Sequence, residues 1–231
     1  IGEHVYGLLH DTTGSDRPFP QNIYDDFERI TTSAAKNGWY VNEHAMQDST
    51  ADRMLSISAK ISEQYPTRDL RWTLGHVDLI SEATVLRAKD LGWNITLANH
   101  TVKPRIEGRA SPPVRMIQDS GILWGMGSDG TIVATYNPFH VIWEYTAGRV
   151  FPNIVKYESD EVITREEALI AHTRSNAHIL FMEDKIGTLE PGKYADLVVL
   201  DRDYLEIPVD EVRSIQPLMT MVAGEVVYEA E

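Results

Sequence analysis

The sequence predicts an α/β fold in which helices cover a parallel sheet, followed by a smaller β-rich segment. Short apolar segments alternate with stretches whose apolar residues recur at helical spacing, from about residue 22 to residue 126. Such alternation is typical of parallel sheets with right-handed crossovers. Polar residues also directly follow successive predicted strands, as they do at the ligand-binding edge of a (β/α) barrel or of an open α/β sheet.

Composition excludes several classes of protein. The chain has 231 residues, a formal net charge of −14 and a hydrophobic content of 42%, which suffices for a sizeable core. The acidic balance argues against a nucleic-acid partner and against an anionic membrane surface, because both require Lys and Arg. The absence of cysteine excludes disulfides and thiolate zinc sites. No apolar run approaches the roughly 20 residues of a membrane span and no signal peptide opens the sequence, so localisation stays open between cytoplasm and periplasm.

Periodicity and end signals locate the elements. We expect helices over 22–37, 50–64, 81–90 and 112–120, from 137 onward, and over 164–181. We expect strands over 39–43, 70–74, 93–97 and 122–126, with residues 1–20 irregular. Gly38 ends the first helix, Ser81 is the N-cap of the third, and Thr164 with Glu167 forms a capping box.

The character of the chain changes near residue 184. The stretch 186–200 is turn-rich and then β-rich, and Met219–Tyr228 reads as a hairpin with its turn near Ala223 and Gly224. Strands of this kind are antiparallel. We therefore expect a barrel-type domain over residues 1–184 and a β-sandwich segment over 185–231.

Three polar residues lie just past three predicted strands. His44 follows the strand at 39–43, His76 follows the strand at 70–74, and Asp129 lies in the small-residue turn Gly125–Gly130. Imidazole and carboxylate groups are ligands that zinc accepts. The alternative interpretation is two structural histidines and an ordinary Asp-Gly turn, and the residues alone leave both open.

Four motifs add a family resemblance. Val41–Asp48, Arg71–His76, Gly127–Asp129 with Asn137–Phe139, and Gly187–Asp201 resemble segments of metal-dependent amidohydrolases. The resemblance is to the branch of N-acyl-D-amino-acid deacylases and related exoenzyme-regulatory hydrolases. It implies the C-terminal half of a distorted TIM (β/α) barrel, strands five to eight, followed by part of a small β-sandwich.

The resemblance also implies an activity. His44, His76 and Asp129 would bind one or two zinc ions, and Asp129 would act as the general base toward a metal-activated water. Independently of the resemblance, Asn99 and His100 follow the strand expected over 93–97, where they would contact a small-molecule substrate; the alternative is a loop asparagine and a surface histidine. From the resemblance we expect hydrolysis of C–N bonds other than peptide bonds. The alternatives are a deaminase, an ester or lactone hydrolase using the same site, or a non-catalytic half-barrel subunit.

Departures from the family pattern concern completeness and substrate. The strand-one His-x-His pair and a strand-four lysine or other bridging ligand are not found; His4 and His10 are too far apart to form that pair. We therefore expect the N-terminal half of the barrel as a partner, and we expect the half-barrel not to fold alone because its edges would be open. Gln47 replaces a Gly of the motif and Gly75 replaces a Glu, which leaves the substrate class open. A homo-oligomer is also left open.

Overall fold

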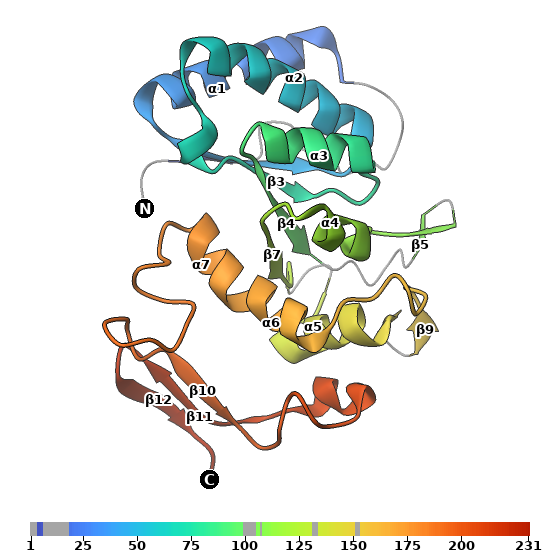
Figure 1. Cartoon of the computed structure of the whole chain (residues 1–231), viewed down its shortest axis with the longest axis vertical. Helices are drawn as coiled ribbons and strands as arrows, with labels where there is room; N and C mark the ends of the chain where they lie inside the picture. Colours follow the sequence, from blue (N-terminus) through green and yellow to red (C-terminus); the bar gives the residue numbers. More distant parts are fainter. Residues whose placement is uncertain (1–3, 7–18, 99–104, 107, 131–133, 151–152) are drawn as a thin grey trace. The chain divides into compact units, whose positions relative to one another are not determined.

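The chain forms two compact units. The structure, a computed structural model, describes residues 4–6, 19–98, 105–106, 108–130, 134–150 and 153–231 (Figure 1). The first unit runs to Ala98 and continues from Ile106 to Trp124, and the second consists mainly of Gly125–Glu231. Among the described residues, no helix is long and apolar enough to cross a membrane.

A parallel sheet organises the first unit and confirms the expected α/β class. Its strand order is β1-β2-β3-β4-β7, and β1, β2, β3 and β4 pair in parallel. The strands are β1 (His4–Tyr6), β2 (Tyr40–Ala45), β3 (Thr73–His76), β4 (Asn94–Ala98) and β7 (Trp124–Gly127). A two-residue pair, β5 (Arg105–Ile106) and β6 (Arg109–Ala110), forms a separate small sheet.

Helices pack on this sheet, and each helix contacts the next one along the chain (Figure 1). They are α1 (Gln21–Asn37), α2 (Asp48–Gln64), α3 (Glu82–Asp90) and α4 (Val114–Ser120). Two buried tryptophans tie helices and strands together. The rings of Trp72 and Trp93 meet edge to face with centroids 5.5 Å apart. Each indole N–H has an acceptor, since Trp72 Nε1 donates to the Trp39 carbonyl and Trp93 Nε1 donates to Ser58 Oγ.

Two strand predictions differ from the structure. Residues 4–6 form β1 beside β2 rather than irregular chain, and three residues are too few for a period to be visible in the sequence. The strand expected over 70–74 begins only at Thr73, because Arg68–Leu70 forms a 3₁₀ turn and Arg71 is left-handed with φ 53°. His76 is consequently the last residue of β3 and does not lie beyond it.

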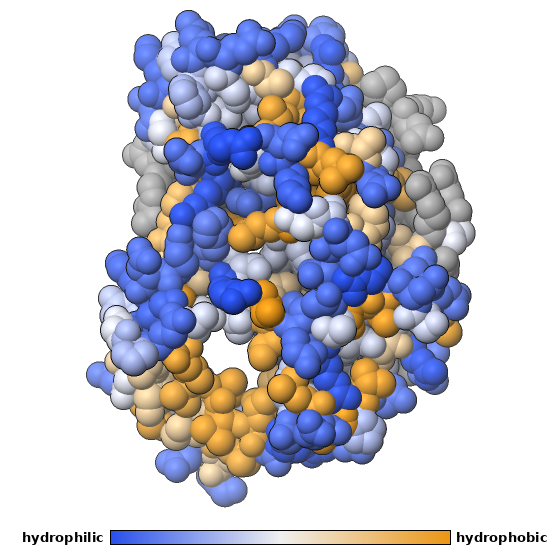
Figure 2. Space-filling view, in the orientation of Figure 1, coloured by the Kyte–Doolittle hydropathy of each residue, from blue (hydrophilic) through white to orange (hydrophobic). Residues whose placement is uncertain are grey.

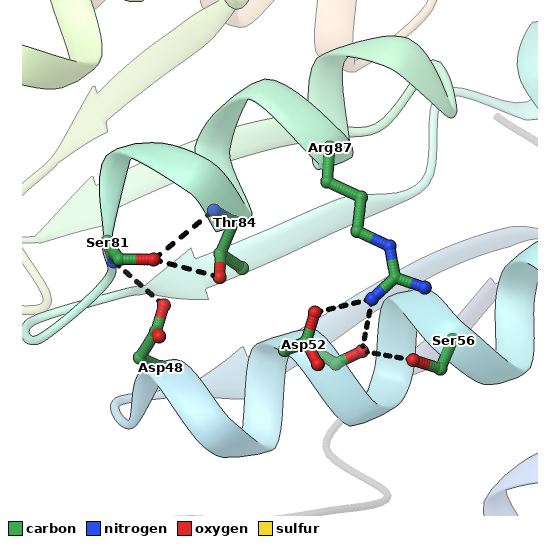
Figure 3. Close-up of polar contacts among 6 residues, drawn as sticks. All are labelled: Asp48, Asp52, Ser56, Ser81, Thr84 and Arg87. Carbon is green, nitrogen blue, oxygen red and sulfur yellow. Dashed lines mark hydrogen bonds and ion pairs between the residues drawn. The ribbon is translucent and has the colours of Figure 1, made fainter.

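Polar contacts fix α3 against α2 (Figure 3). Ser81 caps α3 as expected, since its hydroxyl accepts from the Thr84 N–H at 3.3 Å. The Ser81 N–H itself donates to Asp48 Oδ1 at 2.8 Å, so the first residue of α2 holds the start of α3. One helical turn further on, Arg87 pairs with Asp52.

The second unit contains short helices and antiparallel strands. Its helices are α5 (Pro138–Ala147), α6 (Arg165–Ile170) and α7 (Asn176–Ile179), and a π-helical turn, Ala171–Ser175, separates the last two. Its strands are β8 (Arg149–Val150), β9 (Ile154–Val155), β10 (Leu197–Leu200), β11 (Pro217–Val222) and β12 (Glu225–Glu229). The capping box of Thr164 and Glu167 is present as expected. The single helix expected over 164–181 is divided by the π turn.

A buried ionisable pair lies in the core of the second unit. The side chain of Lys156 is fully buried, and Glu144 on α5 is 3% exposed. Burial raises the pKa of Glu144 to about 7, although the charge of Lys156 acts in the opposite direction. Tyr157, over whose ring Lys156 Nζ lies at 5.4 Å, stacks obliquely near Tyr145 with ring centroids 5.7 Å apart.

The antiparallel sheet β10-β11-β12 confirms the expected terminal hairpin. Its turn is at Ala223 and Gly224, both with positive φ. Figure 2 shows apolar surface gathered over this sheet. The exposed apolar residues on its strands are Val198, Val199, Leu218, Val222, Val226, Val227 and Tyr228. The boundary expected near residue 184, ahead of this sheet, stays a prediction.

We expect Asp48→Ala to lower the free energy of unfolding by about 1–2 kcal/mol, because the Ser81 N–H loses a charged acceptor at a helix start. Asp48→Asn retains an acceptor oxygen and should lose less. Asp26→Ala is the matched control, since Asp26 forms an exposed pair with Arg29 on α1. Denaturant titration of the three variants measures the difference, and equal effects of Asp48→Ala and Asp26→Ala would contradict the prediction.

Stability should also depend on pH through Glu144. Its pKa is about 7 in the folded protein against 4.5 for an ordinary Glu, so the folded state binds the extra proton between these values. This contribution is complete below pH 4.5 and is lost as the pH rises through 7, with a slope of up to about 1.4 kcal/mol per pH unit. Glu144→Gln should flatten that decline, whereas Glu225→Gln on exposed β12 should not. Unfolding free energies measured from pH 4 to 8 test this.

Candidate functional site

Two histidine side chains meet at the carboxyl end of the parallel sheet in the first unit. His44 is the fifth residue of β2, and His76 is the last residue of neighbouring β3. Their ring centroids are 4.1 Å apart with planes inclined by 43°. His44 is 5% exposed, so this pair is mostly shielded from solvent on that side. The structure therefore brings together the two histidines that the sequence singled out.

The backbone of His76 explains how the rings meet. In the parallel register, His44 lies opposite Gly75, and His76 lies opposite Ala45. Regular pleating would send the side chains of His44 and His76 to opposite faces of the sheet. His76 instead has φ 72°, which leaves the strand conformation and redirects its side chain. The left-handed residue thus compensates for the one-residue offset between the histidines.

Hydrogen bonds hold the strained turn after β3. Val77, a β-branched residue, also has positive φ at 47°, a conformation that is rare for its type. Its N–H donates to the carbonyls of Ala45 and Gly75, at 2.9 and 3.1 Å. Leu79 N–H then donates to the Met46 carbonyl at 2.9 Å. Such strain, of order 1–3 kcal/mol per residue, persists only where neighbouring structure over-determines it, and it is characteristic of functional sites.

A buried acid close to the histidine pair was missed by sequence reasoning. Asp78 is 3% exposed and accepts a hydrogen bond from Ser111 Oγ at 3.1 Å. Ser111 precedes α4, so the contact fastens the chain ahead of that helix to the turn that follows His76. The available signal was an acid two positions after a candidate ligand, in Gly75-His-Val-Asp78.

The donor chemistry of the histidine pair fits zinc. Neutral imidazoles are ligands that zinc prefers, and two of them converge here at a strand edge. Within the ranges that the structure describes, no group of three or more His, Asp or Glu side chains is close enough to hold a metal ion. The pair can therefore supply two ligands of a coordination shell, and the others must come from elsewhere.

Asp129 lies in the second unit, on a tight turn after β7. It is exposed and adopts φ 50°. The Gly130 N–H donates to Ser128 Oγ at 3.2 Å, which closes the turn. A Cβ on Gly130 would lie 2.8 Å from the Tyr136 Cα, so only glycine fits there. The turn thus presents a solvent-accessible carboxylate.

The helix that follows the turn begins as the sequence indicates. Asn137 caps α5, its Oδ1 accepting from the Phe139 N–H at 2.9 Å, and Pro138 occupies the first turn. The two proposed substrate residues, Asn99 and His100, lie outside the described residues. Elsewhere in the second unit, His172 is half-buried beside β7 and His178 pairs with Glu183 at 3.4 Å.

Known proteins of related sequence match about half of this chain. An N-substituted formamide deformylase from Arthrobacter pascens is 36% identical over 117 residues, which make up 51% of this chain and 21% of that protein. A 5-methylthioadenosine/S-adenosylhomocysteine deaminase from Symbiobacterium thermophilum is 31% identical over 134 residues, 51% of this chain and 28% of that protein. The matched segments are thus less than a third of either relative.

Solved structures show the fold. A mutant of atrazine chlorohydrolase from Arthrobacter aurescens TC1, complexed with zinc and atraton, superposes with a TM-score of 0.65 at 21% identity, covering 98% of this chain and 50% of that one. This confirms the expected fold, half of a distorted (β/α) barrel followed by part of a small β-sandwich. The model of the amidohydrolase family matches residues 1–228. Because that match extends over nearly the whole sequence, the chain belongs to the amidohydrolase family.

Proposed function

We propose that this chain contributes part of the active site of a zinc-dependent hydrolase acting on C–N bonds other than peptide bonds. The observation that carries the proposal is the convergence of His44 and His76 at the carboxyl edge of the sheet. The names of the two curated relatives support the reaction class. Removal of a formyl group from an N-substituted formamide and removal of an amino group both break a bond between carbon and nitrogen.

Each residue has a separate role in this proposal. Bound zinc would polarise the scissile group and lower the pKa of the attacking water. His44 and His76 would each donate a ring nitrogen lone pair, so both must be neutral, and affinity should fall at acidic pH. Asp129 would also bind the metal, accept a proton from the attacking water and pass it to the leaving nitrogen. Its exposed turn leaves the carboxylate accessible for that transfer.

We further propose that residues beyond this sequence complete the site. The chain spans about half of the length of the atrazine chlorohydrolase structure on which it superposes. The remaining barrel strands would provide the other metal ligands, and Asn99 and His100 would contact a small-molecule substrate. Gly75, where the family motif has Glu, is buried beside Asn42 and Thr96, and a Cβ there would make only ordinary contacts. There is therefore room at position 75 for a side chain that changes substrate specificity.

A deaminase is the second candidate, because one relative bears that name. Deamination uses the same water activation and the same proton transfer, with ammonia as the leaving group. Assays of the complete protein against N-substituted formamides and against amino-purine nucleosides distinguish the two. A protein that binds zinc but has neither activity would favour ester or lactone substrates, and one that binds no zinc would favour a non-catalytic half-barrel subunit.

The histidine pair provides the first test of this proposal. In the complete protein, His44→Ala or His76→Ala should strip zinc and abolish turnover, because each removes one of two converging ligands. His140→Ala is the control, since His140 lies on α5 in the second unit. Metal analysis after dialysis measures occupancy, and full zinc occupancy in both histidine variants would refute the ligand assignment.

Asp129→Asn separates metal binding from proton transfer. The amide keeps one coordinating oxygen and nearly the same shape, but it cannot accept a proton at neutral pH. We expect zinc content and KM to be largely retained while turnover falls by about 10²–10⁴-fold, the range typical of lost general acid–base catalysis. Turnover within a factor of about ten of the parent, with zinc retained, would show that Asp129 is not the base. Asp119→Asn, on α4 and paired with Arg115 at 2.6 Å, is the matched control.

A further inference from the structure

A π-helical turn separates α6 from α7 in the second unit. The side-chain amide of the residue after this turn reaches β7, the strand that precedes the turn of Asp129. The π turn is Ala171–Ser175, and Asn176 follows it as the first residue of α7. π turns are rare, and they occur frequently at functional sites because the extra residue rotates the side chains that follow. The contacts of Asn176 show where the π turn directs its side chain.

The Asn176 side chain joins two backbone carbonyls. Its Nδ2 donates to the Met126 carbonyl on β7 at 2.8 Å and to the His172 carbonyl in the π turn at 3.2 Å. Met126 is 1% exposed, so its carbonyl requires a partner within the protein. One amide group thus satisfies both the disturbed helix and the end of the strand.

Gly125 provides the space for this amide. A Cβ on Gly125 would lie 2.0 Å from Asn176 Oδ1 and 3.0 Å from Ile179 Cδ1. No real structure tolerates the first distance, so any larger residue at position 125 must push the Asn176 amide away from the strand. Gly125 and Asn176 are therefore sterically matched across β7 and α7.

Gly127 explains why the hydrogen bond from Asn176 to the Met126 carbonyl, which we call the amide anchor, is needed. Gly127 ends β7, and nothing lies within 4 Å of the position that its Cβ would occupy. The peptide between Met126 and Gly127 consequently has both conformational freedom and room to rotate. Rotation of that peptide would reorient the segment leading to Asp129, and a hydrogen bond on the Met126 carbonyl opposes it.

His172 contributes to the same anchor. It also hydrogen-bonds to the Met126 backbone, while its buried Nδ1 has no hydrogen-bond partner among the described residues. Burial lowers the pKa of His172, although the Met126 contact acts in the opposite direction. A neutral ring can donate to the carbonyl from its other nitrogen without placing a charge beside the strand.

We infer that Asn176 is a positioning residue for Asp129, holding the Met126–Gly127 peptide so that the turn presents its carboxylate in one orientation. The inference rests on the proposed role of Asp129, on which it depends for any effect on turnover. In this proposal, Asn176 contacts neither the metal nor the substrate. Its loss should therefore affect the rate of the chemical step more than substrate binding or zinc content.

The test uses the complete protein with Asn176→Asp and Asn176→Ala. The Asp variant is nearly isosteric but has no donor for the Met126 carbonyl, and the Ala variant removes the contact altogether. Asn153→Ala is the matched control, because Asn153 is an exposed asparagine of the same unit whose side chain accepts a hydrogen bond from Arg149 at 3.0 Å. We expect both Asn176 variants to lower kcat by roughly 10–100-fold, with KM within about threefold and zinc content unchanged.

Amide hydrogen exchange gives a readout that is independent of activity. Both Asn176 variants should exchange faster at residues 126–130, and Asn153→Ala should not. Unchanged exchange there, or faster exchange with unchanged kcat, would overturn the positioning role. If Asp129→Asn leaves turnover intact, the proposed function fails, whereas the exchange result still decides whether Asn176 restrains the turn.

A double-mutant cycle tests the steric match between the two positions. Gly125→Ala should impair the parent strongly, because it expels the Asn176 amide from the strand. The same change should have a much smaller additional effect on kcat and on exchange when Asn176 is already Ala. Additive effects would show that Gly125 and Asn176 act independently, and the proposed anchor would then be wrong even if both single variants are impaired.

Discussion

The left-handed backbone at His76 is the constraint on which the candidate metal site depends. The parallel ladder places His44 and His76 one residue out of register, which by itself would separate their side chains. The positive φ of His76 and Val77 breaks the pleat at that point and lets the rings approach to 4.1 Å. The strain is held by the Val77 and Leu79 N–H groups, which donate back to the end of β2 and the residue after it. Sheet register and turn strain together define the pair.

In the second unit, the backbone that presents Asp129 is held by different contacts. Asp129 is not held by a ladder but by a turn of small residues, closed by Ser128 and tightly enclosed at Gly130. Glycines make this turn possible and also make it flexible. The side chain of Asn176 reaches β7 from a neighbouring helix and contacts the backbone where that flexibility begins. A π turn, which costs helix regularity, is the feature that brings this amide within reach.

Much of this could be predicted from the sequence, and the exceptions have physical reasons. Helix ends with explicit signals, such as Ser81, Thr164 and the glycine after α1, were located correctly because capping is a local property. The association of His44 with His76 followed from their similar places in successive βα units. The strained backbone of His76, however, is set by hydrogen bonds from β2 and could not be seen in a linear pattern.

Other features depend on contacts between distant residues. The Asn176 contact spans 50 positions, and nothing in the apolar period of the helix marks the π turn. Asp78 was missed because its burial and its bond to Ser111 arise only when α4 is docked. Likewise, β1 was missed because a three-residue strand is defined by its neighbour, β2, rather than by its own composition.

Each of the two units orders its own candidate residues. The histidine pair is complete within the first unit, and the turn of Asp129 is complete within the second. Each part is therefore ordered by contacts of its own, the first by a ladder and the second by an amide anchor. Pre-ordering of this kind means that ligand binding need not organise either part.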